Sequence, residues 1–448
     1  MLNRISERWR SWFGGRSAAA GGGVARDDAA FHFEAALAHN RRGDAENAAA
    51  EYMRALDIRP DYTPARVNLG LIYMTQLGDP QRAQQQFERA VASDPGSVAA
   101  QANLGLALQD RGRLDDALAH YEKLLAAYPK VHEYRWNRGL ALLCRGDFAR
   151  GWDDYESRNA RGTGAPARAF PYPVWNGEAL ADEVLLVYGE QGLGDEIMFA
   201  SCVPDLLERG IRCVLECDQR LANLFRRSFP AAQVHGAARD GDRSWLARHP
   251  QIGRQIACGS LPRILRRDEA AFPRHAGYLR ADAGRVAHWR AQLAPGAEAR
   301  TLIGVAWRGG GIKTRGRLRS IPLPQLAPLF ALPQITWISL QRDGDDELAQ
   351  FATGTVRRCD DALEDTDETA ALISALDCVV TADSTTAHLA AALGRPTKIL
   401  LAEPADWRWM RNRATSPWYP SAVLYRQQRP GDWSAPVAAA SAALRGPS

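Results

Sequence analysis

The sequence predicts an α-helical repeat arm followed by an α/β half that is built from two Rossmann-like lobes. Two observations carry this prediction. A repeat of 34 or 35 residues runs through residues 28–160, and from residue 184 onward short apolar runs alternate with helical stretches. The first pattern is typical of stacked helix pairs and the second of parallel sheets covered by helices. The length of 448 residues suits about three domains.

The composition excludes several classes of protein. The net charge is +4 and the basic residues are spread along the chain, so nothing requires a nucleic-acid partner. No apolar run reaches the ~20 residues that a membrane-spanning helix needs. The seven cysteines show no paired CxxC units and the N-terminus lacks the apolar core of a signal peptide. We therefore expect reduced thiols and a cytoplasmic location.

Residues 1–27 are expected to precede the first domain. Within residues 1–16, apolar side chains at helical spacing alternate with arginines, which is typical of an amphipathic helix in contact with a membrane surface. The favoured interpretation is that this segment docks on the first repeat or is frayed; the alternative is a peripheral contact with the inner membrane surface. Residues 17–27 are rich in alanine and glycine and indicate a linker.

The repeat is defined by a turn glycine, a small residue five positions later and an aromatic residue four positions after that. These features are the glycines Gly43, Gly78, Gly112 and Gly146, the small residues Ala48, Ala83, Ala117 and Gly151, and the aromatics Tyr52, Phe87, Tyr121 and Tyr155. The small residue allows two helices to approach closely, and the aromatic fills the groove between them. Prolines at matching positions end the first three units.

The repeat resembles the tetratricopeptide repeat, because Leu69-Gly70 is followed by Tyr73 as in the first helix of that motif. We expect four repeats over residues 28–160, with the last one capping the array because it lacks the closing proline. Such an arm offers a surface for a protein partner. Packing of the arm against the α/β half of the same chain is an equally weighted alternative.

The first lobe is expected over residues 161–298. A buried strand at 184–188 enters a glycine-rich turn at 189–196, and a helix follows at about 197–207. This order places backbone N–H groups at the carboxyl edge of a sheet, where α/β proteins bind ligands. Asp195 would stand at the start of the helix, either as a base that accepts a proton from a hydroxyl or as a cap of the helix.

The second lobe is expected over residues 299–448 and begins with a strand at 302–307. A basic, glycine-rich stretch follows, with the cations Arg308, Lys313, Arg315, Arg317 and Arg319. Arginines and lysines near a strand end suit a diphosphate. The alternative is a solvated basic loop without a ligand.

A second strand, loop and helix in this lobe carry small hydroxyl residues. The strand at 378–381 leads through Asp383 and Ser384 into a helix that begins at Thr385 and contains His388. Free N–H donors and the positive end of the helix dipole favour a phosphate at such a helix start. A lone helical histidine is usually structural, but His388 lies one helical turn from this expected phosphate site.

Four groups of residues together resemble the tetratricopeptide-containing relatives of glycosyltransferase family 9, the heptosyltransferase-like group. They are residues 190–195, 319–322 and 383–389, and a tryptophan-rich tail at 406–433. The resemblance implies a GT-B fold and a metal-independent, inverting sugar transfer from a nucleotide-sugar substrate, without a cofactor.

The same resemblance assigns roles to individual residues. It implies that Asp195 is the base, and that the donor is held by Gly192, Gly194, Arg308, Lys313, Arg319, Asp383, Ser384, Thr385 and His388. The residues that follow the acid depart from the polar pattern of the relatives: they are Glu196, Met198, Ser201 and Cys202. Acceptor recognition is therefore open.

The leading hypothesis is a glycosyltransferase whose acceptor is a protein or a glycan and whose arm recruits a protein acceptor or partner. An inactive, transferase-like scaffold that acts through its arm is the second hypothesis. A nucleotide-sugar epimerase is the third, which the repeat arm disfavours. Neither the nucleotide nor the sugar is specified by the sequence.

Overall fold

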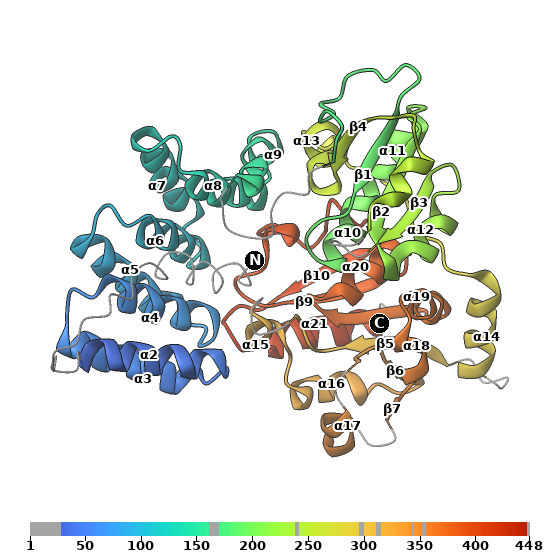
Figure 1. The fold of residues 1–448 in the computed structure, drawn as a ribbon. Helices are drawn as coiled ribbons and strands as arrows, with labels where there is room; N and C mark the ends of the chain where they lie inside the picture. Colours follow the sequence, from blue (N-terminus) through green and yellow to red (C-terminus); the bar gives the residue numbers. More distant parts are fainter. Residues whose placement is uncertain are drawn as a thin grey trace. The chain divides into compact units, whose positions relative to one another are not determined.

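The fold of this chain divides into two compact units (Figure 1). The computed structural model describes residues 28–160, 170–237, 242–294, 300–310, 315–342, 345–351 and 355–445. The first unit holds the helical arm and the second holds both α/β lobes. The predicted amphipathic segment 1–16 lies outside the described residues. Within the described ranges, no helix has both the length and the hydropathy to cross a membrane.

The arm consists of helices that pair in sequence order. Between residues 28 and 155 they are α2 (Asp28–Arg41), α3 (Ala45–Ile58), α4 (Thr63–Thr75), α5 (Pro80–Ser93), α6 (Val98–Asp110), α7 (Leu114–Ala127), α8 (His132–Arg145) and α9 (Phe148–Tyr155). The predicted turn glycines join the two helices of each pair, and all four adopt a left-handed backbone with φ between 66° and 94°. The repeat prediction is therefore confirmed.

Close packing within the pairs explains the repeated residue types. A side-chain carbon added at Gly70 would lie 2.5 Å from Cε1 of Phe87, and one added at Gly105 would collide with the ring of Tyr121. Both rings are fully buried. Glycine is required at these two positions because only a residue without a side chain leaves room for the aromatic ring of the next helix.

The first lobe contains a parallel sheet in the order β3-β2-β1-β4. Its elements are β1 (Val184–Tyr188), α10 (Leu193–Phe199), α11 (Val203–Glu208), β2 (Cys213–Asp218), α12 (Ala222–Ser228), β3 (Gln233–Ala237), β4 (Ile252–Ala257) and α13 (Leu261–Leu265), and α14 (Ala283–Leu293) follows. The helix expected at about 197–207 begins earlier, at Leu193, and is divided into α10 and α11. Pro204 lies in the first turn of α11, where its missing N–H costs no helical hydrogen bond.

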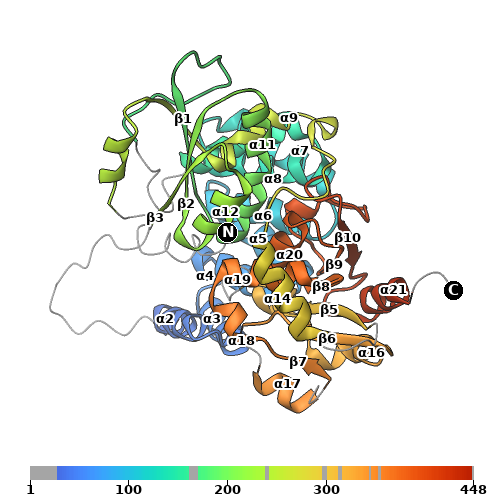
Figure 2. The same ribbon diagram turned by 90° about the vertical axis from the view of Figure 1, so that its right-hand side faces the viewer.

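The second lobe contains a parallel sheet in the order β10-β9-β8-β5-β6-β7. Its strands are β5 (Thr301–Ala306), β6 (Ile335–Ser339), β7 (Val356–Arg357), β8 (Cys378–Ala382), β9 (Thr397–Leu401) and β10 (Ala422–Arg426). Its helices are α15 (Gly316–Arg319), α16 (Ala327–Phe330), α17 (Asp345–Phe351), α18 (Asp360–Glu364), α19 (Thr366–Ala375), α20 (Thr385–Ala392) and α21 (Ser434–Leu444). Figure 2 shows helices on both faces of this sheet. The predicted class, a repeat arm followed by two Rossmann-like lobes, is confirmed.

The two lobes are joined by a partly buried ion pair. Nη1 and Nη2 of Arg227 in α12 donate to the two carboxylate oxygens of Asp367 in α19, at 2.7 and 2.8 Å. The Asp367 side chain is 4% exposed, and its hydrogen bonds raise the pKa of Arg227 although partial burial opposes this. A bidentate pair of this kind fixes orientation as well as distance.

Two short segments from the second half of the sequence cluster with the arm. They are Gly310–Leu318, which follows β5, and Asp406–Arg408, which follows β9. Trp407 is 5% exposed, and its ring lies 5.7 Å from that of Trp152 and 5.6 Å from that of Tyr155. The arm therefore buries a tryptophan that is distant from it in sequence.

Candidate functional site

The glycine-rich turn after β1 leads directly into α10, and Asp195 caps that helix. Its Oδ2 accepts a hydrogen bond from the N–H of Gly192 at 2.9 Å, and its own N–H donates to the Gly192 carbonyl at 3.0 Å. Asp195 is half-buried. The capping alternative that the sequence left open is therefore present in the structure, and a role of Asp195 as a base stays a proposal.

A buried acid, which the sequence prediction treated only as a departure from the family pattern, lies beside this turn. Glu196 is 3% exposed, and its Oε2 accepts from the N–H of Asp218 at 2.8 Å. A side-chain carbon at Gly189 would lie 2.6 Å from the Glu196 carboxyl carbon. Gly189 therefore has to be glycine because the carboxylate occupies the space of a side chain.

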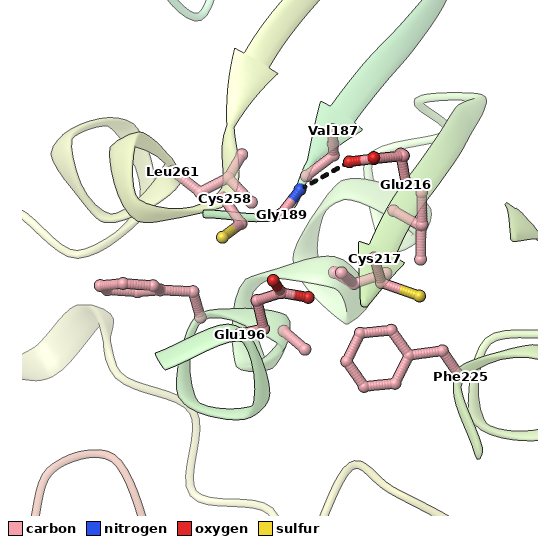
Figure 3. A pocket seen from close by; sticks show the side chains of 12 residues that line it. Val187, Gly189, Glu196, Glu216, Cys217, Phe225, Cys258 and Leu261 are labelled. Atoms are coloured by element: carbon pink, nitrogen blue, oxygen red, sulfur yellow. Dashed lines mark hydrogen bonds between the residues drawn. The ribbon is translucent and has the colours of Figure 1, made fainter. Parts of the chain in front are cut away.

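A second buried acid, Glu216, faces the same turn. Its Oε2 accepts from the N–H of Gly189 at 3.2 Å, and it is 3% exposed. Figure 3 shows both carboxylates beside Gly189 in a small cavity of about 20 Å³ that Cys217 and Cys258 also line. Burial, followed by the charges of the two acids, raises the pKa of the Cys217 thiol. The thiol therefore stays protonated and packs as a small, weakly polar side chain.

The start of α20 in the second lobe lacks the kind of cap seen at α10. Ser384 is the N-cap residue, but its side chain makes no capping hydrogen bond. Its Oγ lies 3.2 Å from Oγ1 of Thr381 instead. The hydroxyl is thereby directed toward the strand end, and the first N–H groups of α20 are not satisfied by the Ser384 side chain.

Asp383 and Arg319 form an ion pair next to this helix start. Nη1 of Arg319 lies 3.2 Å from Oδ2 of Asp383, and the two side chains are 20% and 7% exposed. A side-chain carbon at Gly309 would lie 2.7 Å from the Asp383 carbonyl oxygen and 2.8 Å from Cβ of Arg319. The end of β5 and the end of β8 therefore meet here, as the sequence predicted for parallel strands.

The other predicted cations are distributed over different partners. Nη2 of Arg308 donates to Oε1 of Glu347 at 2.7 Å, and Nε1 of Trp307 donates to Oε2 of the same residue at 2.6 Å. Burial opposes ionisation of Glu347, but these two bonds lower its pKa. Lys313 lies outside the described residues. Arg315 and Arg317 contact the arm.

The glycine-rich turn and α20 are in direct contact through Gly194. A side-chain carbon at Gly194 would lie 3.0 Å from Cδ2 of His388 and 3.7 Å from Cα of Thr385. His388 is 5% exposed and its ring stacks on that of Trp409 at 5.1 Å. The structure thus brings together residues that the sequence predicted as parts of one site.

Two tyrosines that the sequence prediction did not assign hold His388 and α10. Nδ1 of His388 and the hydroxyl of Tyr419 lie 2.8 Å apart, and the hydroxyl of Tyr278 donates to the Ile197 carbonyl at 2.8 Å. Burial raises the pKa of Tyr278 well above its ordinary value, so its hydroxyl remains a donor. Tyr419 lies in the predicted tail motif, which was a usable signal, whereas Tyr278 carried none.

Metal ligands do not gather in this region. Within the described ranges, no group of three or more His, Cys, Asp or Glu side chains could hold a metal ion.

Comparisons with known proteins were made for the whole chain. Residues 29–62, 75–130 and 104–159 match models of the tetratricopeptide repeat. Residues 365–429 match the model of glycosyltransferase family 9 (heptosyltransferase), and this range includes Asp383, Ser384, Thr385 and His388. Protein FlbA of Caulobacter vibrioides is 29% identical over 360 residues, which are 75% of this chain and 59% of FlbA. The chain therefore spans about three fifths of the length of that relative.

Solved structures show weaker likenesses. The E. coli ADP-heptose lps heptosyltransferase II is 17% identical with a TM-score of 0.45, over 58% of this chain and 97% of that one. A mutant of the Thermobaculum terrenum O-GlcNAc transferase is 17% identical with a TM-score of 0.32, over 86% of this chain and 84% of that one. One polypeptide thus carries segments that match models of the tetratricopeptide repeat and a segment that matches the model of glycosyltransferase family 9.

Proposed function

We propose that this chain is a glycosyltransferase that moves a sugar from a nucleotide-sugar donor to an acceptor hydroxyl, with inversion and without a metal ion. One observation carries the proposal. The start of α20 is not capped by the side chain of Ser384, it lies beside the Arg319–Asp383 pair, and it falls within the segment that matches glycosyltransferase family 9. A helix start with available N–H donors and a nearby guanidinium is suited to a diphosphate.

The donor would be held at the second lobe. In this proposal the N–H groups of Thr385 and Thr386 bind phosphate oxygens, and Arg319 supplies the positive charge. Asp383 keeps the guanidinium in place until the donor arrives, since an arginine fixed by one carboxylate loses less freedom when it binds a second anion. As the bond from the anomeric carbon to the diphosphate breaks, the added negative charge on the leaving group is stabilised by these donors.

The acceptor would be activated from the first lobe. The acceptor oxygen forms a bond to the anomeric carbon, its proton passes to the carboxylate of Asp195, and the nucleoside diphosphate leaves with the bonding electron pair. The contact of Gly194 with His388 and Thr385 supports this arrangement because it places the start of α10 next to the start of α20. The hydrogen bond from Gly192 would orient the carboxylate.

The arm would serve recruitment. Tetratricopeptide repeats present surfaces for other proteins, so we propose that the arm brings a protein acceptor, or a protein that carries the acceptor glycan, to the transferase half. The nucleotide-sugar is the substrate that the site itself would select.

A thermal-shift measurement with ADP, GDP, UDP and CDP tests the donor proposal. A nucleotide present at 100 times its dissociation constant should stabilise the chain by about 2.7 kcal/mol. We expect one diphosphate to act at much lower concentration than its monophosphate, because the seat is built for phosphate oxygens. Equal effects of diphosphate and monophosphate, or none from any nucleotide, would reject the proposal.

A transferase-like scaffold without turnover is the second candidate, and one observation favours it: Asp195 already serves as a helix cap. The two candidates differ in the consumption of donor. The scaffold predicts nucleotide binding without release of diphosphate from any nucleotide-sugar, and identical behaviour of the wild type and Asp195→Asn in that assay.

A further inference from the structure

Residues 315–318 contact the repeat arm at three separate places. Nη2 of Arg315 donates to Oδ2 of Asp110 at 2.6 Å, and both terminal nitrogens of Arg317 lie 3.2 Å from Oε1 of Glu46. The side chain of Leu318 approaches Gly78, where an added side-chain carbon would lie 3.1 Å from Cδ2 of the leucine. The segment therefore uses two arginines and one leucine to hold the arm.

The three contact points share a position within their repeats. Glu46 stands in the first turn of α3 just after the turn of the first repeat, Gly78 is the turn of the second, and Asp110 ends α6 just before the turn of the third. We call these three residues the turn edge. They come from three successive repeats, and the short segment formed by Arg315 and the start of α15 contacts all three together.

The pair at Asp110 is the strongest of these contacts. The Asp110 side chain is 9% exposed and that of Arg315 is 22% exposed, whereas Arg317 and Glu46 are 62% and 63% exposed. A partly buried, charge-assisted bond contributes more than an exposed ion pair. Asp110 also ends its helix, where the negative end of the helix dipole favours a cation.

The backbone of the segment supports an anchoring role for Arg315. Its φ is 57°, in the left-handed region that a residue with a side chain adopts at a cost of about 1–2 kcal/mol. The bond to Asp110 offsets this cost, and the small Gly316 that follows is buried. The sequence Arg-Gly-Arg-Leu is thus fitted to the turn edge by its charges, its spacing and its backbone.

We propose that the turn edge is a docking surface for a peptide that carries arginines, and that residues 315–318 are its resident occupant. A partner protein with two arginines separated by one small residue would compete with this segment. The docking surface itself does not depend on the proposed function, because it rests on the contacts of the arm alone.

The test uses the full chain and a fluorescent peptide with the sequence of residues 315–321. Fluorescence anisotropy measures the binding of the peptide to the chain. Replacing the resident arginines (Arg315→Gln with Arg317→Gln) should vacate the edge, so we expect this variant to bind the peptide at least tenfold more tightly than the wild type. Adding Asp110→Asn to the same chain should remove most of that gain. A peptide with both arginines replaced by glutamine should not bind.

Asp116→Asn is the matched control, since Asp116 lies in the same repeat, is exposed and pairs with Arg113 three positions away. It removes the same charge and should leave peptide binding unchanged. Equal affinity of the wild type and the doubly substituted chain, the same loss from Asp116→Asn as from Asp110→Asn, or no peptide binding by any variant would overturn the proposal.

Trypsin gives a second readout that needs no added peptide. Cleavage after Arg315 and Arg317 in the otherwise intact chain should be several times faster in Asp110→Asn than in the wild type or in Asp116→Asn. Identical cleavage rates in all three chains would show that the turn edge does not hold the segment.

Discussion

Two helix starts in the α/β half occupy equivalent places in their sheets but differ in the hydrogen bonds that their side chains make. Both α10 and α20 follow a parallel strand within a few residues, at the carboxyl edge of a sheet. At α10 the side chain of Asp195 closes the turn onto Gly192, whereas at α20 the side chain of Ser384 makes no capping bond. The same local topology therefore yields one helix start whose N-cap N–H is bonded by a side chain of the first turn, and one whose N-cap hydroxyl turns to the preceding strand instead.

The two helix starts are in direct contact. Gly194, in the first turn of α10, packs against His388 and Thr385 of α20. The proposed base at one helix start and the proposed phosphate site at the other are then neighbours. Four predictions sharpen this comparison.

The largest effect is expected from Asp195→Asn. Asparagine can still accept the Gly192 hydrogen bond, so the cap is kept while the negative charge and the base are lost. Transfer should fall by about a hundredfold or more, the usual contribution of a general base. Steady-state release of diphosphate in the presence of acceptor measures it, with nucleotide affinity as the control that should not change. Unaltered turnover would show that Asp195 serves only as a helix cap.

Arg319→Gln should weaken the binding of nucleoside diphosphate by roughly 1.5–3 kcal/mol, the range for hydrogen bonds to charged groups. Glutamine still offers a donor to Asp383, which limits the cost of leaving that buried carboxylate alone. Calorimetry compares this variant with Arg342→Gln, an exposed arginine of the same lobe that lies 3.5 Å from Glu364. If both variants bind the diphosphate like the wild type, Arg319 is not part of the seat.

Gly194→Ala should destabilise the fold by about 1–3 kcal/mol, the usual cost of overpacking. The added methyl group would lie 3.0 Å from Cδ2 of His388, which Trp409 and Tyr419 hold in place. Urea unfolding measures the change. Gly284→Ala in the first turn of α14 is the control and should not destabilise, because alanine is the better helix residue there. Equal stability of both variants would show that the two helix starts are loosely packed.

The smallest effects concern the caps themselves. Asp195→Ala should lower the free energy of unfolding by about 1 kcal/mol, the typical value of a capping interaction. Ser384→Ala should change it by less than about 0.5 kcal/mol, since no capping bond is lost. Chemical denaturation of the two variants provides the comparison. A larger loss at Ser384 than at Asp195 would reverse the assignment of the two helix starts.

Local patterns predicted most of the architecture. The strand at Val184–Tyr188 and the start of α20 at Thr385 are as expected, because an apolar run and a short polar loop define each of them by nearby residues alone. The repeat was equally predictable from the sequence, since the glycine turns recur at a nearly fixed period of 34 or 35 residues. The division of the helix after the glycine-rich turn was missed, although Pro204 was a visible signal for it.

The site was predictable as a set of motifs but not as a set of contacts. The basic stretch was expected to serve one anion, yet the structure divides it: Arg308 meets Glu347, Arg319 meets Asp383, and Arg315 meets Asp110. Those acids lie between 39 and 205 residues away from their arginines. Pairing over such separations depends on tertiary structure, which spacing in the sequence does not encode. The burial of Glu196 escaped prediction for the same reason.

The segments Gly310–Leu318 and Asp406–Arg408 have a consequence for how this protein can be recombined. Because the arm buries Trp407 and binds Arg315, its surface is completed by residues that are encoded well after its last repeat. A gene fusion cut at residue 168 would separate the arm from these residues in one product and leave Trp407 without its aromatic neighbours in the other. Exchange of arms between related chains therefore requires three matched segments in place of one, so the arm and the α/β half are expected to be inherited together.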